Sequence, residues 1–185
     1  MVDYTPLYKG LLFQGSCPSN FADVWSEFDA IVSLCSLGPL ICGTPAGKLH
    51  IIYPFADEPI DDNDRWAFKQ LTNQIVWLVK EGKRVLVHCA AGLNRSGLIC
   101  ALALLQLTDW SSEKIITHIQ DLRPLALCNP YFMSFIKSLR PEIFQCGVCG
   151  AHTRVLLLFI YAVSANLGTV ETSVAPAVNG FGSAA

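Results

Sequence analysis

A cysteine and an arginine six positions apart, Cys89 and Arg95, are the residues of this 185-residue chain best suited to chemistry. They bound the segment Cys-Ala-Ala-Gly-Leu-Asn-Arg, which His88 precedes and Ser96 follows. An apolar run lies before the segment and a run of helix formers lies after it, so the pattern predicts a strand, a turn and a helix. The unpaired N–H groups of a helix that follows a parallel strand attract anions. The spacing therefore predicts an anion site with a thiol at its base.

The residue types in this turn suit a phosphate monoester. Gly92 allows the positive φ that a nest of N–H groups needs, and Arg95 can hold two phosphate oxygens through its planar fork. A thiol beside a helix N-terminus and an arginine is favoured as the thiolate, so Cys89 would attack phosphorus and form a phosphocysteine. The alternative is an ordinary buried cysteine beside a structural arginine. The predicted phosphate-binding residues are Ala90, Ala91, Gly92, Leu93, Asn94 and Arg95.

Alternating apolar runs and helical patterns must position this segment. They predict an α/β fold with a mostly parallel central sheet flanked by helices. The helix expected after the acidic segment has Trp66, Leu71, Ile75, Leu78 and Val79 as its apolar face, with a cap at residues 62–64. The strands are expected at residues 10–16, 29–35, 48–55 and 83–88, and the helices at 19–28, 65–82, 96–107, 112–122 and 131–139.

Composition limits the possible partners and the compartment. Charged residues make up 15% of the chain and its net charge is −2, so nothing indicates electrostatic attraction to nucleic acid. Several of the eight cysteines lie in apolar runs and the first residues lack a secretory pattern, which predicts reduced thiols in the cytoplasm. The apolar run at residues 155–163 is too short for a membrane span, which needs about 20 residues.

The character of the chain changes near residue 146. We expect a catalytic domain at residues 1–145 and a separate, apolar, low-charge tail of unknown role at residues 146–185, partly disordered. Cys146, Cys149 and His152 have the spacing of metal ligands, but no second pair of ligands accompanies them. No metal and no other cofactor is therefore expected, because backbone N–H groups and Arg95 already balance the phosphate charge.

The segment "HCAAGLNRSG" resembles the P-loop of cysteine-based protein tyrosine phosphatases, and the lengths around it resemble the compact dual-specificity branch. The resemblance covers about residues 7–140 and includes "LLFQGS", "DAIVSLC", "HIIYPFADEP" and "LRPLALCNPYFMSFI". It implies a phosphotyrosine protein phosphatase-like fold, with Cys89 as the nucleophile and Arg95 as the phosphate clamp. It also implies that the Ser96 hydroxyl bonds the Cys89 sulfur and helps it leave, while His88 orders the loop from behind.

The resemblance further implies a proton donor on a loop about thirty residues before the nucleophile. Asp57 directly follows a predicted strand and lies 32 positions before Cys89 (89 − 57), so it is the first candidate for the general acid. Asp61 is the second candidate, and Asp62 and Asp64 are expected to cap the following helix. Once ionised, Asp57 would activate water against the phosphocysteine.

Cys35 ends a predicted strand on the same side of the sheet as the P-loop. Some phosphatases of this superfamily keep a cysteine there that forms a reversible disulfide with the nucleophile. Cys35 is therefore a candidate redox partner, and an ordinary buried cysteine is the alternative.

The resemblance predicts a phosphatase that acts on phosphotyrosine, with phosphoserine and phosphothreonine left open. A phosphoprotein substrate and a monomer are expected, without nucleic acid and without a transmembrane span. An RNA 5′-phosphatase is an alternative, because Gly-x-Asn-Arg resembles that branch too, but no basic groove is evident. A phosphoinositide phosphatase is disfavoured because the turn lacks lysines, and a non-catalytic phospho-binding module would need a missing nucleophile, arginine or acid.

Overall fold

The computed structural model describes residues 3–37 and 43–139. It contains a five-stranded sheet in the order β1-β2-β5-β3-β4. The pairs β2·β5, β5·β3 and β3·β4 are parallel, and only β1 pairs antiparallel. This confirms the predicted α/β fold with a mostly parallel sheet, while the tail predicted at 146–185 lies outside the described residues. The strands are β1 (Tyr4–Tyr8), β2 (Leu12–Ser16), β3 (Ala30–Ser33), β4 (Leu49–Ile52) and β5 (Val85–Cys89).

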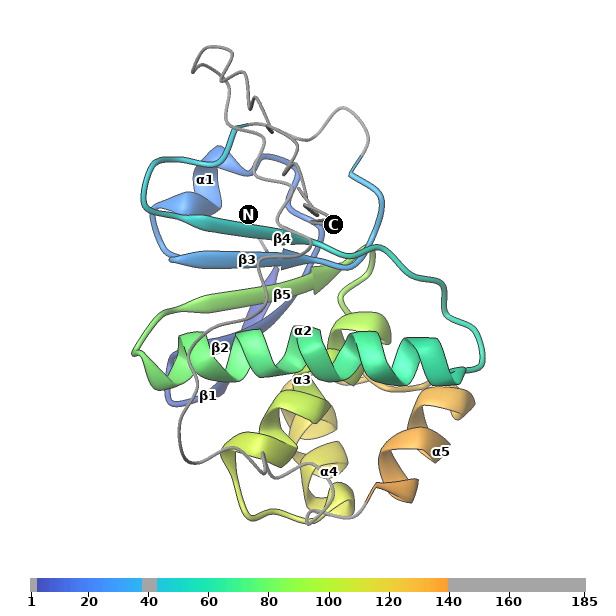
Figure 1. Cartoon of the computed structure of the whole chain (residues 1–185). Coiled ribbons are helices and arrows are strands. Elements are labelled where there is room, and N and C mark those ends of the chain that lie inside the picture. The colour runs from blue at the N-terminus through green and yellow to red at the C-terminus, as the bar shows by residue number, and fades with distance from the viewer. Residues whose placement is uncertain (1–2, 38–42, 140–185) are drawn as a thin grey trace, which may run out of the picture.

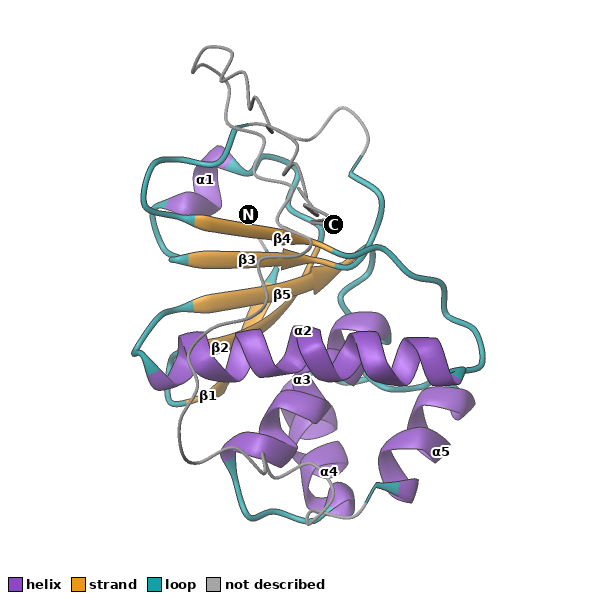
Figure 2. Cartoon of the chain, viewed as in Figure 1, coloured by secondary structure: helices purple, strands orange, loops and turns teal. Residues whose placement is uncertain are grey.

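Helices cover both faces of the sheet (Figures 1 and 2). The short α1 lies on one face, and α2 to α5 lie on the other. Successive strand residues alternate between the two cores: Val85 and Val87 join the larger one, and Leu86 joins the α1 side. None of the helices in the described ranges is long and apolar enough to cross a membrane. The helices are α1 (Ala22–Trp25), α2 (Asp62–Lys80), α3 (Arg95–Leu107), α4 (Ser112–Leu122) and α5 (Pro130–Ser138).

The start of α2 differs from the prediction. Asp61, not a residue of 62–64, is the N-cap: its Oδ1 accepts from the Asp64 N–H at 2.8 Å, and the Asp64 carboxylate accepts from the Asp61 N–H at 3.2 Å. This reciprocal capping box lets the helix begin three residues before the expected Arg65. Asp61, the second candidate acid, is thereby occupied as a helix cap.

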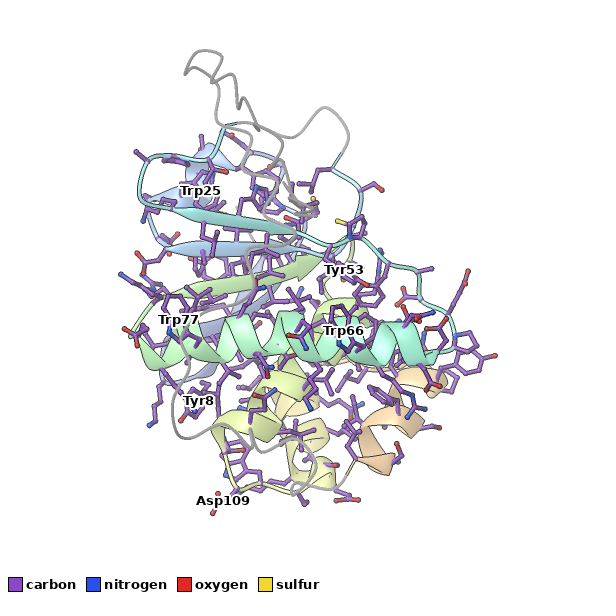
Figure 3. All side chains as sticks on the ribbon, in the orientation of Figure 1. Tyr8, Trp25, Tyr53, Trp66, Trp77 and Asp109 are labelled. Carbon is purple, nitrogen blue, oxygen red and sulfur yellow. The ribbon has the colours of Figure 1, made fainter. Side chains whose placement is uncertain are left out.

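The buried face of α2 also differs from the prediction at one residue. Leu71, Ile75, Leu78 and Val79 are buried, but Trp66 is 57% exposed. At about 100° per residue, Trp66 lies opposite Ile75 on the helix, so it points away from the core. Figure 3 shows Trp66 on the outer side of α2.

The sequence pattern did not predict β1. This edge strand contains Pro6, which cannot donate to a sheet ladder and is tolerated at an edge. It pairs with β2 through a tight turn in which Lys9 and Gly10 both have positive φ. The hairpin places Asp3 and β2 beside the carboxyl end of β5, where the predicted site lies.

Candidate active site

The loop between β5 and α3 forms the base of the candidate site. Every residue of β5 is buried, the strand ends at Cys89, and α3 begins at Arg95. Gly92 has the predicted positive φ, +69°. Within the described part of the chain, no backbone N–H of residues 90–95 donates a hydrogen bond. The loop therefore offers a set of free donors at a helix N-terminus, which suits an anion.

Two polar side chains hold this loop through the opposite groups, its carbonyls. The buried Gln14 donates from Nε2 to Gly92 O at 2.9 Å and to Leu93 O at 3.3 Å. Arg123 donates from Nε to the same Gly92 carbonyl at 2.7 Å, and its guanidinium pairs with Asp3. The hydrogen bonds from Arg123 hold the pKa of the Asp3 carboxyl below its usual range. Because these bonds engage the carbonyls, the N–H groups stay available to a ligand.

Cys89 and Ser96 meet at the base of the loop. Cys89 Sγ lies 3.5 Å from Ser96 Oγ, and both residues are buried. Ser96 is the second residue of α3, so the turn of residues 90–94 brings its hydroxyl back to the strand end. The hydroxyl is close enough to donate to the sulfur.

Arg95 and Asp57 also meet at the site. The Nη1 of Arg95 donates to Leu34 O and to Phe55 O, each at 3.1 Å, which fixes the guanidinium between the loops after β3 and β4. Its Nε lies 3.7 Å from the Asp57 carboxylate and, within the described residues, makes no hydrogen bond. The side chain therefore keeps an unused, buried donor beside the loop.

Asn129 connects the loop that carries Asp57 to the P-loop. Its Nδ2 donates to the Asp57 carbonyl at 3.1 Å, and its backbone N–H donates to Asn94 Oδ1 at 3.1 Å. Its Oδ1 caps α5 by accepting from the N–H groups of Tyr131 and Phe132. This residue was not predicted from the sequence as part of the site, although an asparagine directly before a proline and a helical pattern indicates an N-cap.

His88 lies behind the P-loop in a buried polar chain. Ser33 Oγ is 2.6 Å from His88 Nε2 and 2.7 Å from His50 Nε2. Burial lowers the pKa of both imidazoles to about 4, so both are neutral near pH 7. A neutral imidazole that is hydrogen-bonded to Ser33 of the neighbouring strand can position the end of β5.

Cys35 lies at the strand-end edge, as its sequence position predicted. It is buried, and burial raises the pKa of its thiol to about 11. The Cys17 sulfur, after β2, lies close to it, and this neighbour was not predicted from the sequence. The sulfur atoms of Cys17 and Cys35 and a ring nitrogen of His88 all lie within 4.8 Å of one another.

Comparisons with known proteins agree with this geometry. The family model "Dual specificity phosphatase, catalytic domain" matches residues 24–141. A curated relative, dual specificity protein phosphatase 2 of Homo sapiens, is 25% identical over 139 residues, which cover 71% of this chain and 42% of that protein. This chain therefore spans less than half of that relative's length.

Solved structures are similar in fold. Tk-PTP in its active form has a TM-score of 0.61 and 22% identity, and the match covers 73% of this chain and 94% of that one. PTPMT1, crystallised in complex with PI(5)P, has a TM-score of 0.59 and 18% identity, and the match covers 73% and 93%. At these identities the similarity establishes the phosphatase fold alone.

Proposed function

Because this chain belongs to the dual specificity phosphatase catalytic-domain family, we propose that it hydrolyses phosphotyrosine in proteins, with phosphoserine and phosphothreonine as further substrates. One observation carries the proposal. A buried thiol, a loop whose N–H groups have no partner among the described residues, and the Arg95–Asp57 pair converge at the end of β5. That set contains a nucleophile, an anion site and an acid, which phosphomonoester hydrolysis requires.

In the first step, the phosphate binds to the loop N–H groups and to the unused Nε of Arg95. The anion displaces the Asp57 carboxylate from that guanidinium, and Asp57 takes up a proton from solvent as it moves toward the leaving oxygen. The Cys89 sulfur attacks phosphorus and forms the S–P bond while the P–O bond to the side chain breaks. Asp57 gives its proton to the departing oxygen, which leaves as the free hydroxyl.

In the second step, the Asp57 carboxylate removes a proton from a water molecule, which attacks the phosphocysteine and releases phosphate. The Ser96 hydroxyl, 3.5 Å from the sulfur, donates to the leaving thiolate. His88 stays neutral and positions the strand end through Ser33. No metal or other cofactor takes part in this scheme.

The residues of the anion-binding loop, 90–95, favour a protein substrate over a polyanionic one. PTPMT1 was crystallised with PI(5)P, so a lipid phosphate is the second candidate on this fold. The turn residues 90–94 of this chain contain no lysine to pair with additional phosphates. The net charge of −2 likewise offers little attraction for RNA.

The cysteines of the described residues are all free thiols, which supports the reducing cytoplasm as the compartment.

A substrate panel tests the proposal: phosphotyrosine and phosphothreonine peptides, phosphoinositides and triphosphate RNA. Cys89→Ser should abolish turnover and keep phosphate binding. Asp57→Ala should lower kcat by about 10²–10⁴-fold with little change in affinity. Asp62→Ala, an exposed acid of the same segment, is the matched control and should retain activity. Full activity in Cys89→Ser would refute the mechanism, and preference for a phosphoinositide would replace the substrate class.

A further inference from the structure

Cys17, Cys35 and His88 converge from three neighbouring strands of the sheet. Cys17 directly follows β2, Cys35 follows β3 by two residues, and His88 lies in β5, which pairs with both. One ligand atom from each residue lies within 4.8 Å of the other two. Cys35 and His88 are buried, and Cys17 is half-buried, so the group has a route to solvent at one corner.

The donor set suits a zinc ion. Zn²⁺ prefers thiolate sulfur and imidazole nitrogen in a tetrahedral arrangement, in which two sulfurs on Zn–S bonds of about 2.3 Å lie about 3.8 Å apart. The two sulfurs would therefore need to approach each other by at most about 1 Å (4.8 − 3.8). Two thiolates and a neutral imidazole also cancel the charge of the ion, which reduces the cost of burying it.

His88 has a nitrogen suited to this ligation. Ser33 Oγ occupies Nε2 at 2.6 Å, as an outer partner that would orient the ring. Nδ1 is buried and makes no well-formed hydrogen bond within the described residues, although the Cys89 backbone lies beside it. An ion bound at Nδ1 would fill the unused coordination of this atom, and a ring nitrogen of His88 is the atom that lies within 4.8 Å of both sulfurs.

We propose that Cys17, Cys35 and His88 bind Zn²⁺ and that the bound ion lowers the phosphatase activity. The two thiols release their protons to solvent as the ion binds. The binding stands without any catalytic assumption, whereas the inhibition rests on the proposed function.

The inhibition follows from how the ligands join the P-loop. The Cys17 N–H donates to Ala90 O at 3.2 Å, and His88 is bonded directly to Cys89. Drawing Cys17 and His88 toward one ion therefore moves the loop on both sides of the nucleophile. A displacement approaching 1 Å at a catalytic group can cost about a hundredfold in rate.

Cobalt and zinc titrations of the reduced full chain test the binding. Co²⁺ should give the absorption bands of tetrahedral thiolate coordination at one ion per chain, and Zn²⁺ should displace it. Cys17→Ser should weaken binding by at least about a hundredfold, since loss of even an outer partner costs 10–100-fold. Circular dichroism and thermal unfolding verify that this variant is folded. Cys128→Ser, which removes an exposed thiol, should bind as the original chain does.

Three further variants locate the ion. Retention of the cobalt bands in both Cys17→Ser and Cys35→Ser would overturn the proposal. Loss of the bands only in Cys146→Ser/Cys149→Ser would assign the metal to the tail, and loss only in Cys89→Ser would assign it to the nucleophile; either result refutes the site.

Activity in buffered Zn²⁺ tests the second half of the proposal. The original chain should be inhibited at ion concentrations that leave Cys17→Ser active, and equal inhibition of both would refute the link. A chain with no phosphatase activity at all would refute the proposed function, and the cobalt bands would still decide whether the site exists.

Discussion

A methyl group added at Gly92 should disable the P-loop. Gly92 has a φ of +69°, and a Cβ there would lie 2.5 Å from the backbone C and O of Gly15 and from the Ser16 nitrogen. Ordinary contacts begin near 3.4 Å, so the loop and β2 must separate by about 0.9 Å (3.4 − 2.5). Neither side is a flexible side chain, because both are backbone. The Gly92→Ala chain must therefore shift the N–H groups that would bind phosphate.

Gly82→Ala provides a matched control for the backbone strain. Gly82 has a φ of +75°, yet a Cβ there would meet nothing within 4 Å. Both substitutions should cost about 1–2 kcal/mol of stability, the penalty for a left-handed alanine. Only Gly92→Ala adds the collision with β2.

Steady-state kinetics and phosphate binding separate the two effects. We expect kcat/KM of Gly92→Ala to fall by about a hundredfold, as for a 1 Å misplacement, with weaker phosphate binding. Gly82→Ala should keep both within about twofold of the original chain. Urea unfolding verifies that both variants are folded. Equal kinetics in two folded variants would refute the view that the Gly92–Gly15 contact sets the geometry of the anion-binding loop.

Three further predictions concern the residues around the loop. Asn129→Ser keeps a good helix cap, but the shorter side chain cannot reach the Asp57 carbonyl. The kcat of this variant should therefore fall more for phenyl phosphate than for p-nitrophenyl phosphate, whose leaving group needs less help from an acid. An equal loss of kcat for both substrates would contradict a role of Asn129 in placing Asp57. Burial holds the pKa of His50 near 4 in the folded state against 6.5 unfolded, so the free energy of unfolding should decrease as the pH falls from about 6.5 to 4. Measured by urea unfolding, the free energy of unfolding of His50→Gln should decrease over that pH range by up to about 3 kcal/mol less than that of the original chain. An identical decrease in the two chains would contradict the lowered pKa of His50. Mild peroxide should oxidise the Cys89 sulfur to a sulfenic acid, which the Cys35 thiol then attacks to give a disulfide and water. Mass spectrometry should detect the disulfide-linked Cys35–Cys89 peptide. Absence of this peptide would exclude Cys35 as a redox partner.

The sequence predicted the parts of the site that are contiguous in the chain. The β5–turn–α3 unit occupies residues 85–107, and its apolar run, glycine and helix formers each indicate a local structure. Asp57 could be selected because a strand pattern ends just before it. The mostly parallel pairing of the sheet likewise followed from the alternation of strands and helices, whereas the strand order was not predicted.

The supporting contacts could not be predicted, because they join distant parts of the chain. Gln14 and Gly92 are 78 positions apart, and Asn129 and Asp57 are 72 apart. A glutamine within an apolar run or an asparagine before a proline indicates local structure only, and its long-range partner depends on the packing. Cys17 was overlooked for the same reason, since it approaches Cys35 only when β2 and β3 flank β5.

The attachment of Arg95 to two carbonyls has a consequence for protein engineering. Its Nη1 donates to Leu34 O and Phe55 O, so the loops after β3 and β4 together fix the position of the Arg95 guanidinium. A chimera that imports only the loop after β4 from a homologue would bring a new acid. Its carbonyl at position 55 would then no longer be matched to the one at Leu34, and both must accept from Arg95. Grafts that alter substrate preference should therefore exchange both loops together, or retain the backbone at residues 34 and 55 and vary only the side chains that face the substrate.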